Sequence, residues 1–230
     1  FASGPEVLLR TGHRVAMPRS RPWRLVAVGA SNPTANAGVA RAGRRCDAGA
    51  LERTEAQMGR LIYAANISLD GFVEDETGSF DWSVPDEEVH AFWNEHERHI
   101  GTSLYGRRMY EAMRVWEDDD WLTDEPTVVR EYAEIWRDAD KVVYSSSLVE
   151  PSTARTRIER RFEPDFVRRL KESSSANLSI GGAGIAAEAF RHGLVDECVL
   201  LVCPVVVGGG KSALPAGVRL DLELLEHRRF

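Results

Sequence analysis

The stretch Asn177-Leu178-Ser179-Ile180-Gly181-Gly182-Ala183-Gly184-Ile185 decides the fold of this 230-residue chain. Its first half has the length of a buried strand, and the two-glycine turn leads into an apolar segment that predicts a helix over 185–192. Gly193 follows in the position of a helix C-terminal cap. A glycine turn at a helix start lets a phosphate approach free backbone N–H groups, but an isolated motif of this kind is more often a tight turn that needs positive φ.

Strands and helices alternate along the chain from Met58 onward. Short apolar or alternating runs predict strands over 60–67, 102–105, 141–144, 157–162, 177–180 and 198–207. Helix-start signals or helical periodicity follow at Ser83, Arg107, Val128, Pro164 and Ile185, with Ser83 as the predicted N-cap of the first helix. This alternation predicts an α/β fold with a mostly parallel sheet flanked by helices, and ligands of such folds bind at the carboxyl ends of the strands.

Several predicted strand ends carry residues suited to phosphate binding. Gly106-Arg107-Arg108 repeats the glycine-then-helix arrangement and adds two guanidinium groups, and Ser145-Ser146-Ser147 could donate hydroxyls to a ribose or a 2'-phosphate. Two phosphate-binding turns suggest a dinucleotide. A Rossmann dehydrogenase is not expected, because the first strand is followed by Ser68-Leu69-Asp70-Gly71 and not by the glycine fingerprint.

Asp70 and Glu87 are the candidate catalytic acids, and Trp82 could form an apolar wall over a planar ring. Asp70 could equally be a turn former and Glu87 a helix N-terminal acid. The spacing of His90, His96 and His99, with no partnered cysteine, favours a solvated face over a metal site. No nucleophile-base set is evident.

The net charge of the residues before Met58 differs in sign from that of the residues from Met58 onward. Residues 1–57 hold nine Arg and four acidic residues, a net charge of +5, whereas residues 58–230 carry −12. We expect residues 1–57 to be a disordered or non-native leader and residues 58–230 to be the functional domain. The acidic balance argues against nucleic-acid binding, and the absence of a run of about 20 apolar residues argues against a membrane span. We therefore expect a soluble, cytoplasmic protein.

The ordered set of motifs resembles the dihydrofolate reductase-like superfamily, and more closely the C-terminal reductase domain of bacterial riboflavin-biosynthesis deaminase-reductases and their stand-alone relatives. The resemblance spans nearly all of 60–214. Its motifs are Ser68-Leu69-Asp70-Gly71, Gly106-Arg107-Arg108-Met109-Tyr110-Glu111, Val142-Val143-Tyr144-Ser145-Ser146, Ile180-Gly181-Gly182-Ala183-Gly184, and Gly193-Leu194-Val195-Asp196-Glu197 with Pro204-Val205-Val206-Val207-Gly208-Gly209-Gly210.

The resemblance implies a three-layer fold with a mixed, mostly parallel central sheet, and NADPH as the cofactor. It places the phosphates at Gly106, Arg107 and Arg108 and the ribose or 2'-phosphate near Ser145 and Ser146. The pyrophosphate is expected at Gly181, Gly182, Ala183, Gly184 and Ile185. Ala65 is expected beside the nicotinamide, and the spacing of Trp82 and Glu87 matches the tryptophan and substrate-binding carboxylate of the folate enzymes.

The expected function is therefore NADPH-dependent reduction of a small heterocyclic or carbonyl substrate, of the kind performed by 5-amino-6-(5-phosphoribosylamino)uracil reductase. Dihydrofolate reduction and a catalytically silent nucleotide-binding module of the same fold are the alternatives. The zinc deaminase pattern of the two-domain riboflavin enzymes is absent from the sequence. The resemblance also suggests a homodimer, and a C-terminus that stops on the first arm of the family's final hairpin.

Overall fold

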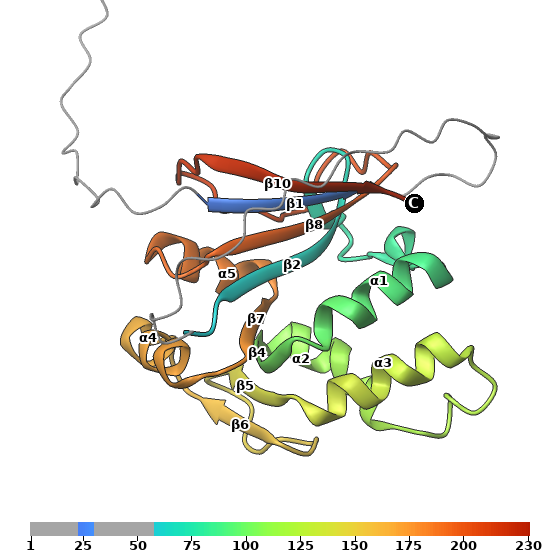
Figure 1. Ribbon diagram of the computed structural model, residues 1–230, viewed down its shortest axis with the longest axis horizontal. Coiled ribbons are helices and arrows are strands. Elements are labelled where there is room, and N and C mark those ends of the chain that lie inside the picture. The colour runs from blue at the N-terminus through green and yellow to red at the C-terminus, as the bar shows by residue number, and fades with distance from the viewer. Residues whose placement is uncertain (1–22, 30–57) are drawn as a thin grey trace, which may run out of the picture.

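A computed structural model describes residues 23–29 and 58–230 (Figure 1). An eight-stranded sheet forms the middle layer, with helices on both faces. Neighbouring strands follow the order β10-β1-β8-β2-β7-β4-β5-β6, and all seven pairings between these described strands are parallel. The predicted α/β class with a mostly parallel sheet is therefore confirmed, and the antiparallel pairing lies in a separate two-stranded ribbon, β3-β9.

The strands of the main sheet are short and mostly apolar. Their bounds are β1 Trp23–Gly29, β2 Leu61–Ser68, β4 Ile100–Gly106, β5 Asp140–Tyr144, β6 Thr156–Glu159, β7 Asn177–Gly181, β8 Glu197–Cys203 and β10 Leu222–Arg229. The ribbon consists of β3 Phe72–Glu74 and β9 Lys211–Ser212. Successive side chains of β2 enter different cores: Tyr63 packs in the cluster that contains Phe190 of α5, and Ile62 packs near Trp93 of α1.

Five α-helices and two short 3-10 turns connect the described strands. Their bounds are η1 Asp81–Ser83, α1 Glu87–Glu97, α2 Arg107–Met113, η2 Arg114–Glu117, α3 Thr127–Asp138, α4 Pro164–Ser173 and α5 Ala183–Arg191. Helices α4 and α5 supply apolar side chains to one core, whereas α1 and α2 pack in separate clusters against alternate residues of the same strands. Figure 1 shows α1 and α3 lying beside each other on one side of the sheet.

The start of α1 differs from the prediction. Asp86 is the N-cap, because its side chain accepts a hydrogen bond from the Val89 N–H at 2.9 Å, and Ser83 instead ends η1. Serine and aspartate both cap helices well, so residue type alone does not favour Ser83 over Asp86. Pro85 stands between them, and the residue that precedes a proline is disfavoured in helical conformation, which moves the helix start to the later one.

The end of β8 also differs. The strand stops at Cys203 and not at Val207, since Pro204 has no N–H for the sheet ladder and Val206 is largely exposed. By contrast, the predicted cap at Gly193 is confirmed. Its φ is +64°, and the N–H groups of Gly193 and Leu194 donate to Phe190 O and Ala189 O, each at 3.0 Å, which is the Schellman arrangement.

Strand β1 is an element that the sequence analysis did not predict. Trp23–Gly29 lies between β8 and β10, in register with Glu197–Val202 on one side and Leu222–Arg229 on the other. The other residues of the predicted leader lie outside the described residues. No helix in the described ranges is long and apolar enough to cross a membrane.

Candidate functional site

The carboxyl ends of four adjacent strands bring the predicted site residues to one edge of the sheet. These strands are β2, β7, β4 and β5, in that order. Gly181 pairs with Tyr105, the residue before Gly106, and Gly106 pairs with Tyr144, the residue before Ser145. Because the strands are parallel, the turns that follow them lie side by side.

The two glycine turns approach each other closely. A Cβ at Gly181 would lie 2.8 Å from a Tyr105 ring carbon, which leaves no room for a larger residue. A Cβ at Gly182 would lie 3.3 Å from Met109 Cβ and 3.9 Å from the Gly106 backbone nitrogen. The structure thus places the start of α5 beside the start of α2, as the phosphate-binding hypothesis requires.

The start of α5 presents backbone N–H groups. Gly182 is its N-cap with φ +98°, a conformation that favours glycine, and no side chain caps the helix. The N–H groups of Ala183, Gly184 and Ile185 have no acceptor within the helix. Gly184 is exposed, and nothing lies within 4 Å of its Cβ position, so a ligand can approach this turn from solvent.

Arg107 and Arg108 occupy the first turn of α2. Arg107 Nη1 lies 3.1 Å from Glu111 Oε1, and Arg108 Nη1 lies 3.7 Å from Glu74 Oε1. Both arginine side chains are about half exposed or more, and exposed pairs of this kind are worth little. An incoming anion can therefore compete for either guanidinium group.

The two predicted serines of the turn after β5 differ in exposure and in role. Ser145 is buried, and its Oγ accepts hydrogen bonds from the N–H groups of Ser147 and Leu148 at 3.3 and 2.9 Å. Ser146 is exposed. Arg160, which the sequence analysis missed, donates from Nη1 to Ser145 O at 3.3 Å and Leu148 O at 2.6 Å. A guanidinium group thus lies at this turn, although no sequence motif indicates it.

Asp70 holds two loops together. Its carboxylate accepts hydrogen bonds from the N–H groups of Val207 at 3.2 Å and Gly208 at 2.8 Å, across 137 and 138 residues of sequence. The Ser68 hydroxyl, and then these backbone groups, lower the pKa of Asp70 below its ordinary value. Asp70 is therefore ionised at neutral pH, and its contacts favour a positioning role over proton donation.

Trp82, which was predicted to form an apolar wall, lies in η1 beside β2. It is partly buried against the apolar cluster that contains Val89 and Leu201. Asn66 of β2 anchors this wall, because its Nδ2 donates to Ser83 O at 3.1 Å. The Trp82 Nε1 and Asn66 Oδ1 atoms are buried and have no hydrogen-bond partner among the described residues.

Glu87 and Ala65 complete the predicted set. Glu87 is the exposed first residue of α1, and within the described ranges no hydrogen bond or ion pair joins it to Asp70 or Trp82. Ala65 is partly buried and pairs with Leu200 of β8. The catalytic roles of Glu87 and Asp70 remain predictions.

An open cavity of about 570 Å³ adjoins the start of α2. It is lined by the 74–78 turn together with Arg108, Gly210 and Lys211. Glu74 Oε1 lies 3.7 Å from Arg108 and 4.0 Å from Lys211. This cavity therefore borders the proposed phosphate-binding turns.

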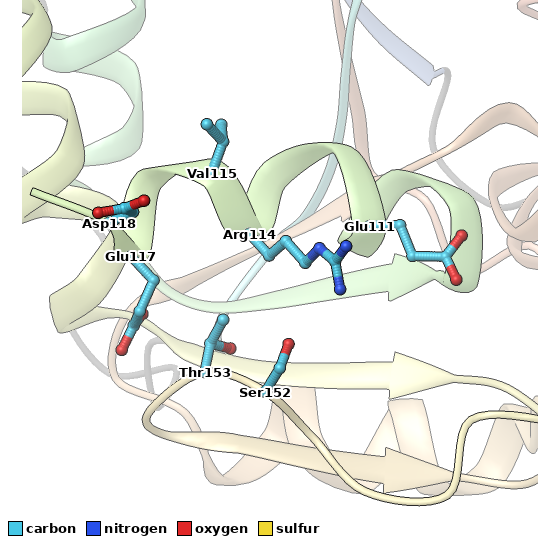
Figure 2. Close-up of a pocket in the computed structure, with 7 residues that line it drawn as sticks. All are labelled: Glu111, Arg114, Val115, Glu117, Asp118, Ser152 and Thr153. Atoms are coloured by element: carbon cyan, nitrogen blue, oxygen red, sulfur yellow. The ribbon is translucent and has the colours of Figure 1, made fainter. Parts of the chain in front are cut away.

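Another cavity, of about 510 Å³, lies at the C-terminal end of α2 (Figure 2). Arg114 extends towards Glu111 there, and Glu117 points to the loop that carries Ser152 and Thr153. Glu117 Oε1 accepts from the Ala154 N–H at 3.0 Å, which fastens that loop to η2. None of the predicted site residues lines this cavity.

Comparison with known proteins agrees with this fold. Uncharacterized protein YyaP of Bacillus subtilis (strain 168) is 29% identical over 175 residues, which cover 74% of this chain and 89% of YyaP. Uncharacterized protein YwjB of the same organism is 28% identical over 152 residues, covering 65% and 79%. A crystal structure from Shewanella sp. PV-4, whose name proposes a role in riboflavin biosynthesis, matches with a TM-score of 0.53 at 20% identity, covering 70% of this chain and 85% of that one.

The family comparison covers the whole α/β domain after β1. The sequence model of the RibD C-terminal domain matches residues 60–230, a range that includes every predicted site residue. The fold is the α/β fold with a mostly parallel sheet that the sequence predicted. The chain therefore belongs to the RibD C-terminal domain family.

Proposed function

We propose that the protein is an NADPH-dependent reductase of the riboflavin-biosynthesis type, acting on a small heterocyclic or carbonyl substrate. One observation carries the proposal: the glycine turns at Gly106 and Gly182, 76 residues apart in sequence, lie side by side at the carboxyl edge of the sheet. Membership in a reductase-like family supports the same conclusion.

The residues on this edge fit an anionic dinucleotide. The uncapped N–H groups of Ala183 and Gly184 are suited to the pyrophosphate, and Arg107 and Arg108 add positive charge beside them. Ser146 and Arg160 at the next strand end supply a hydroxyl and a guanidinium group, a pair suited to the 2'-phosphate that distinguishes NADPH from NADH.

The protein's part in the reaction is to bind, orient and exclude water. NADPH, when bound, supplies the hydride. We assign Ala65 and Trp82 to the faces of the reacting rings and Glu87 to the substrate. Asp70 keeps the 204–210 loop in place beside the end of β2 through its two backbone hydrogen bonds.

Titration with NADPH tests the cofactor assignment. The protein contains six tryptophans, so binding is expected to quench tryptophan fluorescence, with NADPH binding more tightly than NADH. A lack of response at high micromolar NADPH would overturn the proposal. Absorbance assays with dihydrofolate and with pyrimidine substrates then identify the activity.

A charge placed at the start of α5 gives a sharper test. Gly184→Asp puts a carboxylate where the pyrophosphate is proposed to bind, while the open space at this position and the helix dipole both tolerate it. We expect NADPH affinity to fall by roughly tenfold or more through charge repulsion, with an unchanged or higher Tm. Gly184→Ala is the matched neutral control, and equal affinities for the two variants would contradict the assignment.

A further inference from the structure

Two cations line the 570 Å³ cavity beside the start of α2. Arg108 lies in the first turn of α2, and Lys211 is the first residue of β9. Both face the same carboxylate oxygen, because Glu74 Oε1 lies 3.7 Å from Arg108 Nη1 and 4.0 Å from Lys211 Nζ. These distances are too long for hydrogen bonds. Within residues 58–230 neither cation therefore donates a hydrogen bond, and the N–H groups of both are available to a ligand.

The two-stranded ribbon holds Lys211 at the cavity. Lys211 of β9 pairs with Glu74 of β3 in antiparallel register. Gly210, just before Lys211, has φ +129°, and a side chain at this position would collide with the backbone of Glu74 and Asp75. Only glycine allows the two chain segments to approach each other so closely. The backbone, and not a flexible side chain alone, thus places Lys211 at the cavity wall.

The other two acids at this cavity are engaged by their own loops. Asp75 Oδ1 accepts hydrogen bonds from the Thr77 N–H at 2.8 Å, the Thr77 hydroxyl at 2.7 Å and the Ser79 N–H at 3.0 Å. Glu76 lies against Gly209, where a Cβ would be 2.7 Å from Glu76 Oε1. Among the acids that line the cavity, Glu74 is therefore the one that forms ion pairs with its two cations.

The cavity lies between the two parts of the proposed cofactor site. On one side, Met109 follows Arg108, and its Cβ lies 3.3 Å from the Cβ position of Gly182 in the proposed pyrophosphate turn. On the other side, Asp70 holds the Gly208 N–H at the end of β2, the strand that carries the residue proposed to lie beside the nicotinamide. A dinucleotide that extends from one side to the other brings its pyrophosphate past this cavity.

We propose, on the basis of the proposed function, that Lys211 is a further cofactor-binding residue. Together with Arg108 it binds the pyrophosphate of NADPH, and Glu74 occupies both cations until the cofactor displaces it. A pyrophosphate has several anionic oxygens, so it accepts hydrogen bonds from an ammonium and a guanidinium group at once. The Glu74 ion pairs are long, and 76% of the Arg108 side chain is exposed, so little binding energy opposes the exchange.

A purely structural role for Lys211 makes a different prediction. Opposite charges on paired antiparallel strands stabilise a ribbon without any ligand. In that case, replacement of Lys211 changes the Tm of the protein and leaves its affinity for the cofactor unchanged. Tm is therefore measured for each variant beside the dissociation constants of NADPH and NADH, which are obtained from tryptophan fluorescence.

Removal of the Lys211 charge is the first test. Lys211→Met is expected to weaken NADPH and NADH by the same factor, roughly tenfold, because both contain the pyrophosphate and one charge-assisted hydrogen bond is lost. Lys211→Arg keeps the charge and is expected to retain most of the affinity. Arg160→Met, by contrast, is expected to weaken NADPH more than NADH. Arg168→Met removes a cation from an exposed ion pair on α4 and is the matched control, expected to change neither affinity.

Removal of the competing carboxylate is the second test. Glu74→Gln keeps the length of the side chain and is expected to raise the affinity for both cofactors several-fold, with a gain that shrinks as salt is added. The gain is expected to be smaller when Lys211 is already methionine, because one of the two cations that Glu74 occupies is then missing. A double-mutant cycle of Glu74→Gln and Lys211→Met measures this coupling.

The outcomes separate this proposal from the proposed function. If the native protein binds no NADPH, the proposed function fails before the variants are compared. If NADPH binds and Lys211→Met binds both cofactors as tightly as the native protein, the assignment of Lys211 is wrong and the cofactor assignment stands. A loss confined to NADPH would overturn the pyrophosphate contact, and an unchanged or lower affinity in Glu74→Gln would overturn the displacement of Glu74.

Discussion

At the scale of single residues, Asp70 is the candidate whose role the structure sharpens most. Its two backbone hydrogen bonds predict that Asp70→Asn frees the 204–210 loop, with faster hydrogen exchange at the Val207 and Gly208 amides. Because the folded-state pKa of Asp70 is lowered, the stabilisation exists at neutral pH and is lost as pH falls through that lowered value. The variant and the native protein should therefore exchange alike in strong acid. Exchange that is unchanged at neutral pH would contradict the positioning role.

The candidate site residues could be proposed from the sequence because glycines and serines at strand ends are visible without knowledge of their partners. Arg160 could not be identified from the sequence, because its partners at this turn are the backbone carbonyl groups of Ser145 and Leu148. Every residue has a backbone carbonyl group, so such a contact requires no particular residue type at the partner positions. In the same way, the partners of Asp70 are backbone N–H groups more than 130 residues away.

At the scale of elements, α5 yields a prediction from the glycine in its first turn and the glycine that follows its end. Gly193 has φ +64°, so Gly193→Ala is expected to destabilise the protein by about 1 kcal/mol. Gly184 is helical with open space at its Cβ position, so Gly184→Ala is expected to stabilise by about 0.5–1 kcal/mol. Urea unfolding of both variants measures this. Changes of the same sign in both would show that backbone conformation is not the cause.

Elements with a continuous apolar pattern were predicted well, and their ends less well. The β8 boundary was placed too late because Val205–Val207 continue the apolar run beyond Pro204, although they are no longer in the sheet. Strand β1 was missed because Trp23–Gly29 is isolated in sequence from the other strands, and its pairing partners lie near residues 200 and 225.

At the scale of the whole molecule, Glu97 links stability to pH. Burial raises its pKa from 4.5 to about 7, so the folded protein holds this proton between those values and loses stability as pH rises through them. Glu97→Gln is therefore expected to raise Tm at pH 8 and to leave it nearly unchanged at pH 5. The control is Glu134→Gln on the exposed face of α3. An equal change in Tm at both pH values would contradict the assignment.

His96 has the opposite effect on the pH dependence of stability. Burial, and then the neighbouring His99, lower its pKa from 6.5 to about 4, so stability falls as pH drops across that window. The Tm of Glu97→Gln is compared with that of the native protein at the same pH. Both proteins contain His96, so its contribution to stability cancels in this comparison.

The position of β2 in the sheet has a consequence for the growing chain. This apolar strand lies between β7 and β8, and the Leu61 N–H bonds to Asp196, 135 residues later. During synthesis, both edges of β2 stay open until most of the domain has left the ribosome. The centre of the sheet thus forms late. Until then an unpaired hydrophobic edge is available to other chains, so chaperone capture and aggregation at high expression follow directly from the strand order.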